Sequence, residues 1–180
     1  MTILKPKFLI AIDPSLCSIG VSTFLRGNLE NIYSIKPKIN TEDEYSRHLE
    51  IVKSIRELMN INKKQILESD NYLAIESQYI NFGAKFISTV LKTSVATGVI
   101  IATYMNYMVE LKKDFKVISV APLEAKVAVG VRGKLKRKES KAEVKRMVHL
   151  LYPQCREIKS QDVIDSIAIG LAGVGKIKFI

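Results

Sequence analysis

The stretch Phe8-Leu-Ile-Ala-Ile-Asp13-Pro-Ser-Leu-Cys-Ser-Ile-Gly20-Val-Ser-Thr-Phe24 decides the fold. Its first apolar run, residues 9–12, contains β-branched side chains that suit a buried strand, and Pro14 ends that strand. Gly20 opens a second apolar run, so the stretch predicts a hairpin with Asp13 at the end of its first strand. Capping the turn is the simplest role for Asp13. As a buried ion without a positive partner, it would instead cost several kcal/mol.

The chain of 180 residues, 47% of them hydrophobic, is long enough for one good core and short for two. We therefore expect a single domain over residues 1–180. No basic start followed by an apolar segment and small residues marks a secretion signal. The longest uncharged run, residues 93–109, is shorter than the roughly 20 residues of a membrane span. We therefore expect a cytoplasmic protein without a membrane segment.

Downstream of the hairpin, the apolar patterns predict a third strand and then an alternation of helices and strands. Strands are expected at residues 28–35, 72–76 and 117–120. Helices are expected at about 42–60, at 86–111, at 122–129, from Ser140 onward and from near Ser160 onward. Thr41 is the expected N-cap of the first of these helices, and Ser140, with Glu143 three residues later, is the expected N-cap of the fourth. This order predicts an α/β fold with a mixed five-stranded sheet, three antiparallel strands and then parallel ones, flanked by helices.

Positive charge is concentrated in one segment. Lys and Arg outnumber Asp and Glu by 28 to 18, which gives a net charge of +10. Eight of the basic residues lie between positions 132 and 146, where only Glu139 and Glu143 oppose them. They are Arg132, Lys134, Lys136, Arg137, Lys138, Lys141, Lys145 and Arg146. Such a cluster indicates a polyanion site, although a solvated basic loop has the same composition.

Four carboxylates stand at the ends or starts of apolar elements. Glu76 ends its strand as Asp13 does, and Asp162 and Asp165 share one face of the last helix. A helix N-terminus favours acids by about 0.3–1 kcal/mol, which accounts for Asp162 but less well for Asp165 in an apolar helix. If all four converge, a pair of divalent cations is needed to offset their charge. That arrangement would be a two-metal hydrolase site for Mg²⁺, with Mn²⁺ able to substitute.

Five motifs together carry a resemblance to a known family. They are Ile10-Ala-Ile-Asp13-Pro-Ser with Gly20, Leu73-Ala-Ile-Glu76, Ile118-Ser-Val-Ala-Pro122 leading through Lys126 to Val129-Gly130, Lys141-Ala-Glu-Val144-Lys-Arg-Met147-Val148, and Gln161-Asp162-Val-Ile-Asp165-Ser-Ile-Ala-Ile169. In order and spacing, over about residues 10–171, the chain resembles RuvC-type Holliday junction resolvases, with a phage-type branch as one option.

This resemblance implies a ribonuclease H-like fold, a homodimer, and Mg²⁺-dependent symmetric nicking of four-way DNA junctions. It implies catalytic and metal-binding roles for Asp13, Glu76, Asp162 and Asp165, and catalytic roles for Lys126 and Lys141. The family's aromatic at the junction centre would be Tyr79 or Phe82, for which core packing is an equally good explanation. The expected DNA-binding residues are Tyr79, Phe82, Lys126, Arg132, Lys134, Lys136, Arg137, Lys138 and Lys141.

The small residues Ser94, Ala96, Thr97 and Gly98 predict that the homodimer forms through the long helix, about Phe86–Leu111. Three alternatives to a strict junction resolvase remain at this stage: a broader branched-DNA nuclease, an RNA-processing nuclease of the same fold, and a non-catalytic junction-binding module. Gly170-Leu-Ala-Gly-Val-Gly175-Lys176 resembles part of a P-loop, but Ile177 replaces the required Ser or Thr and no strand precedes it. We interpret that stretch as a helix C-cap and tail and expect no nucleotide cofactor.

Overall fold

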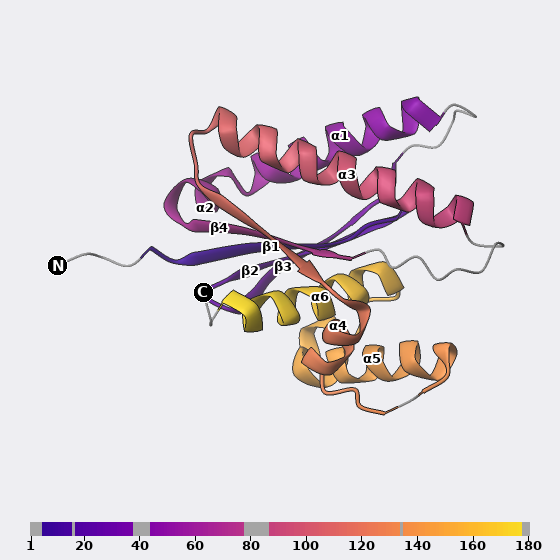
Figure 1. Ribbon diagram of the computed structural model, residues 1–180. Helices are drawn as coiled ribbons and strands as arrows, with labels where there is room; N and C mark the ends of the chain where they lie inside the picture. The colour runs from indigo at the N-terminus through magenta and orange to yellow at the C-terminus, as the bar shows by residue number, and fades with distance from the viewer. Residues whose placement is uncertain (1–4, 16, 38–43, 78–86, 134, 178–180) are drawn as a thin grey trace.

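The structure is a computed structural model that describes residues 5–15, 17–37, 44–77, 87–133 and 135–177 (Figure 1). Its five-stranded sheet has the order β3-β2-β1-β4-β5. The strands are β1 (Lys7–Asp13), β2 (Ile19–Leu25), β3 (Asn28–Ile35), β4 (Asp70–Glu76) and β5 (Phe115–Val120). β2 is antiparallel to both β1 and β3, whereas β4 runs parallel to β1 and β5 parallel to β4. The mixed five-stranded sheet is therefore confirmed.

Helices cover both faces of this sheet (Figure 1). On one face lie α1 (Glu44–Ile61), α2 (Lys63–Glu68) and α3 (Ile87–Glu110), and on the other lie α4 (Pro122–Ala128), α5 (Arg137–Leu151) and α6 (Gln161–Ile177). Because side chains alternate along a strand, β1 sends Phe8, Ile10 and Ile12 into the core under α1 and α3. Leu9 and Ala11 enter the core under α6. No helix among the described residues has the length and apolarity to cross a membrane.

The predicted elements match the observed ones within a few residues, with α2 as a helix that the apolar pattern did not reveal. The cap expected at Thr41 lies outside the described residues. The cap expected at Ser140 is wrong, because α5 begins at Arg137, one turn earlier. There Glu139 accepts a hydrogen bond from the backbone N–H of Lys136 (3.1 Å). Ser140 is consequently a buried residue inside the helix.

The interpretation of residues 170–176 as a C-cap and tail is also wrong, because α6 continues as a helix to Ile177. Its glycines serve close packing. A methyl group built on Gly170 would overlap the ring of Phe24 in β2, and one on Gly173 would lie 2.9 Å from the Cβ of Ala74 in β4. Glycine is therefore required where α6 meets the sheet, although it lowers intrinsic helix propensity.

The same strand, β2, anchors α6 at two further points. A methyl group on Gly20 would overlap the backbone carbonyl of Asp162, and the Ser22 hydroxyl donates a hydrogen bond to the carbonyl of Ser166 (2.9 Å). Since Ser22 is fully buried, this bond also satisfies a polar group that would otherwise be costly. The start of α6 is thus fixed against the end of the β1–β2 hairpin.

We expect Gly170→Ala to destabilise the protein by about 1–3 kcal/mol, because the ring of Phe24 is fully buried and has no room to move. Gly175→Ala is the matched control in the same helix, since a methyl group there would meet no atom within 4 Å. That variant should be stabilised by about 0.5–1 kcal/mol through helix propensity. Urea unfolding of both variants measures the difference, and equal midpoints would contradict close packing at Gly170.

Candidate active site

Two acids lie at the carboxyl ends of neighbouring parallel strands. Asp13 follows Leu9 and Ala11 in the alternation of β1, and Glu76 follows Tyr72 and Ala74 in β4, so both side chains face α6. Because Ile12 of β1 pairs with Ile75 of β4, the two acids end their strands at the same level of the sheet. Asp13 itself pairs with Gly20 across the hairpin.

The other two acids come from the first two turns of α6. Asp162 meets β2 at Gly20, where the missing side chain lets the helix approach the backbone. Asp165 lies one turn further on, and its Oδ1 accepts a hydrogen bond from Gln161 Nε2 (2.8 Å). This bond engages Oδ1, while the other carboxylate oxygen, Oδ2, faces the Lys141 amine at 4.0 Å. The four predicted acids are thereby brought to one end of the sheet.

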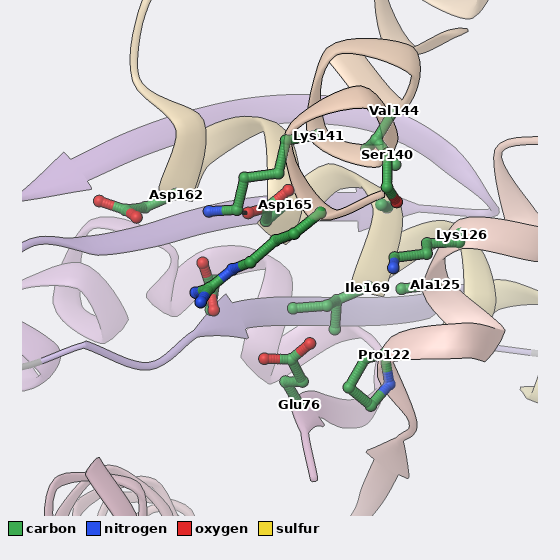
Figure 2. Close-up of a pocket in the computed structure, with 13 residues that line it drawn as sticks. Glu76, Pro122, Ala125, Lys126, Ser140, Lys141, Val144, Asp162, Asp165 and Ile169 are labelled. Carbon is green, nitrogen blue, oxygen red and sulfur yellow. Dashed lines mark ion pairs between the residues drawn. The ribbon is translucent and has the colours of Figure 1, made fainter. Parts of the chain in front are cut away.

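An open pocket of about 310 Å³ collects these acids together with cationic side chains (Figure 2). Asp13, Glu76, Asp162 and Asp165 line it from β1, β4 and α6. Lys126 of α4 and Lys141 of α5 line it from the other side, and so do Arg137 and Ser140. The Nζ of Lys141 lies 4.0 Å from Oδ2 of Asp165, and Figure 2 shows Lys141 reaching toward that carboxylate.

The carboxylates are strongly perturbed by their surroundings. Desolvation raises the pKa of Asp13 to about 8, and the charges of Glu76, Asp165 and Asp162 add to the rise, which Lys141 opposes. Desolvation also raises the pKa values of Glu76 and Asp165. The amines of Lys141 and Lys126 act in the opposite direction on both groups. Such clustered shifts in a pocket are typical of functional sites.

The donor set fits a hard divalent cation, because carboxylate oxygens are the ligands that Mg²⁺ and Mn²⁺ prefer. A cation would also relieve the mutual repulsion that raises the pKa of Asp13. Among the described residues, no three acids or histidines are gathered closely enough to hold an ion as the side chains stand. To bind an ion, the carboxylates would have to move closer together around it.

The remaining predicted DNA-binding residues lie elsewhere. Lys136 and Lys138 are exposed and do not line the acid pocket, and Arg132 lies on a separate surface beside Leu135 and Glu143. The predictions for Tyr79, Phe82 and Lys134 fall outside the described residues.

Sequence reasoning missed the structural roles of two residues in or beside the pocket. Gln161 was quoted only as part of a motif, although its spacing of four from Asp165 already favours a hydrogen bond within a helix. Ser140 was interpreted as a cap, whereas it is a buried pocket residue. No sequence signal separates Arg137 from its basic neighbours, because only the helix start at that residue turns it toward the pocket.

Comparison with solved structures establishes the fold class. The chain superposes on RuvC of Thermus thermophilus in complex with Holliday junction substrate with a TM-score of 0.68 at 16% identity, covering 96% of each chain. A second Thermus thermophilus RuvC structure gives a TM-score of 0.67 at 17% identity over the same shares. The yeast mitochondrial Holliday junction resolvase Ydc2 gives 0.55 at 14% identity, covering 99% of this chain and 83% of Ydc2. The fold is ribonuclease H-like, as the resemblance implied.

The family follows from the sequence itself. The profile of the family described as crossover junction endodeoxyribonuclease RuvC matches residues 9–173, which include all four acids and both lysines of the pocket. The chain belongs to the RuvC family. Among curated proteins, none matches its sequence significantly.

We expect metal-free protein to lose stability as pH rises. Folding raises the pKa of Asp13 from 3.8 to about 8. Below about pH 4 both the folded and the unfolded chain carry the proton, and between pH 4 and pH 8 only the folded chain does, so stability falls steadily across that interval. Asp13→Asn removes this dependence, so its stability relative to wild type should rise by about 3 kcal/mol between pH 5.5 and pH 8.5. Thermal unfolding in EDTA measures it, with the exposed Glu30→Gln as control. Parallel pH profiles of Asp13→Asn and wild type would contradict the shift.

Proposed function

We propose that the protein is a DNA endonuclease that resolves four-way (Holliday) junctions by paired symmetric nicks. The observation that carries this proposal is the gathering of Asp13, Glu76, Asp162 and Asp165 in one open pocket opposite Lys126 and Lys141. Membership of the RuvC family supports the substrate class, as does the likeness to a RuvC solved with a Holliday junction.

The four acids are proposed to hold two Mg²⁺ ions, with Mn²⁺ able to substitute. Bound there, the ions supply Lewis acidity for hydrolysis of a phosphodiester. The protein's own share is to present the oxygens. Gln161 holds Oδ1 of Asp165 by a 2.8 Å hydrogen bond, so that Oδ2 is directed toward the pocket as a ligand. Asp13 gives up its proton when it becomes a ligand, because its pKa of about 8 leaves it largely protonated at neutral pH.

Lys126 and Lys141 are proposed to stabilise charge on the phosphate during hydrolysis. Both amines act electrostatically on Glu76 and Asp165 already, which means that they lie within range of the reacting centre. A cation fixed where negative charge develops lowers the barrier without reorganisation at the moment of reaction. The exposed Arg132, Lys136 and Lys138 are assigned to the phosphate backbone further away, where they add affinity and no base specificity. Lys134, with Tyr79 or Phe82 at the junction centre, remains part of the proposal from sequence.

A non-catalytic junction-binding module is disfavoured by the electrostatics of the pocket. A protein that only bound DNA would gain nothing from acids whose charges repel one another and repel phosphate. The choice between strict four-way junctions and broader branched DNA is decided by the cleavage assay below.

The homodimer is proposed to form through α3, with a different set of residues from the one predicted. Ala96 is fully buried toward the core, so it does not belong to an interface stripe. The exposed apolar and small residues of α3 instead follow the alternating spacing of four and three that suits helix pairing. They are Leu91, Val95, Gly98, Ala102, Met105 and Val109. Two copies related by a two-fold axis would place two active sites on one junction.

The nuclease proposal predicts that Glu76→Gln or Asp165→Asn reduces cleavage by at least about a hundredfold, because each removes a proposed metal ligand. Junction binding should persist or tighten, since negative charge near the phosphates is lost. Single-turnover cleavage of labelled four-way, three-way, linear duplex and single-stranded DNA with Mg²⁺ measures both selectivity and loss. The exposed Glu30→Gln should cleave like wild type. Cleavage rates near wild type in Glu76→Gln and Asp165→Asn would contradict the proposed metal-binding role of these acids.

The dimer proposal predicts that the double variant Val95→Glu, Met105→Glu is monomeric. Both side chains are exposed, 52% and 41%, so the charges should not disturb the fold and should repel across a paired α3. Sedimentation velocity at micromolar concentration measures the state of association. Leu150→Glu, an equally exposed apolar position on α5 (56%), is the matched control and should sediment like wild type. A monomeric wild type bound to a junction would contradict pairing through α3.

A further inference from the structure

The first turns of α5 turn one polar face toward the acid pocket. Arg137, Ser140, Lys141 and Val144 line it, at the spacing of three and four residues that marks one side of a helix. The flanking Lys136 and Lys138 do not line it. Arg137 is therefore separated by geometry from the basic neighbours with which it is continuous in sequence.

We propose that Arg137 and Ser140 form a phosphate-binding subsite beside the acid cluster, which holds the DNA phosphate next to the one that is cleaved. The identity of the ligand as a DNA phosphate rests on the proposed nuclease function. The subsite itself rests on the side chains at the start of α5.

Ser140 is the first observation that indicates a ligand. Its side chain belongs to a residue only 3% exposed, yet it lines the pocket, and Figure 2 shows it on the side of α5 that faces Lys126. The Ser140 hydroxyl forms no hydrogen bond within the described part of the chain, and it is not one of the fully enclosed polar atoms that lack a partner, so its oxygen is accessible from the pocket. The Ser140 backbone N–H donates to the Lys136 carbonyl one turn earlier (2.8 Å). A ligand oxygen in the pocket would satisfy the hydroxyl.

Arg137 is the second observation. Lys126 and Lys141 both lower the pKa values of Glu76 and Asp165, so these amines act on the acids. Arg137 is not among the charges that shift Asp13, Glu76 or Asp165, and it forms no ion pair with any described residue. Arg137 therefore lines the pocket without a carboxylate partner among the described residues. A planar guanidinium with several donors matches the geometry of a phosphate.

The start of the helix adds to the same preference. α5 has 15 residues, its first turn carries backbone N–H groups without intrahelical acceptors, and the Glu139 carboxylate takes only the N–H of Lys136. An anion at this end is favoured by the helix dipole. Because the acids surround the position of the cleaved phosphate, the anion beside Arg137 and Ser140 is the adjacent phosphate on that strand.

Binding to four-way junctions that each carry one neutral methylphosphonate near the cleavage site tests the subsite. In EDTA, neutralising one phosphate beside the cleaved bond should weaken wild-type binding about tenfold, but weaken Arg137→Ala less than twofold, because the contact is already lost. In Ser140→Ala, the same neutral phosphate should weaken binding by a factor between those of wild type and Arg137→Ala. Lys138→Ala should weaken binding to every junction by one common factor, and the exposed Arg156→Ala should change none.

An equal effect of methylphosphonates on wild type and Arg137→Ala at every position would overturn the subsite and leave Arg137 as a solvated charge. Arg137 is exposed, so its variant should fold, and the unfolding midpoint of Ser140→Ala is measured in the same samples. If Ser140→Ala unfolds, the comparison of wild type with Arg137→Ala is sufficient to test the subsite. Cleavage of the unmodified junction by wild type with Mg²⁺ separates the two proposals. If the methylphosphonate effect depends on Arg137 but the junction is not cleaved, the subsite is supported and the nuclease proposal is wrong. If the junction is cleaved but the methylphosphonate effect does not depend on Arg137, only the subsite proposal is wrong.

Discussion

The match in length between β2 and α6 is the constraint on which the site depends. Gly20, Ser22 and Phe24 are two residues apart on one face of the strand, and they meet Asp162, Ser166 and Gly170, which are four residues apart on one face of the helix. Two strand residues span about 6.6 Å and four helix residues about 6.0 Å, so the three contacts stay in register. Since Gly20 also pairs with Asp13, this register sets the acids of α6 against the acid of β1.

Packing, and not attraction, therefore gathers the carboxylates. The contacts that fix α6 against β2 are a close backbone approach, a buried hydroxyl bond and a glycine against an aromatic ring, none of which involves a charge. The stability of the fold can consequently support a group of acids whose ionisation it opposes, as the raised pKa of Asp13 shows. This is the ordinary relation between a rigid scaffold and a strained site, in which apolar burial elsewhere offsets the local cost.

The sequence predicted most of this arrangement and failed where tertiary contacts override local signals. Asp13 and Glu76 could be predicted because each ends an apolar strand, and strand alternation then assigns both to one face. Gly170 and Gly173 were misread as the end of a helix, because local propensity cannot reveal that Phe24 and Ala74 need the space. The start of α5 was missed because no Ser, Thr, Asp or Asn caps it. The Glu139 carboxylate accepts a hydrogen bond from the Lys136 backbone N–H instead, and Ser140, with Glu143 after it, fits the usual cap pattern better.

The acidic and the cationic side of the pocket are built on different elements of the fold, so residues on the cationic side can change without moving the acidic side. The acids stand on the sheet and on α6, inside the contacts that hold the fold together. The cations stand on α4 and α5, and α5 buries only Val144 and Val148 among its apolar side chains in that core. Exchanging a polar residue on the pocket face of α5 leaves the register of α6 on β2 untouched, so the cationic wall can change its contacts with the ligand while the acidic wall keeps its geometry. The reverse does not hold, because any side chain added at Gly20 displaces Asp162 directly.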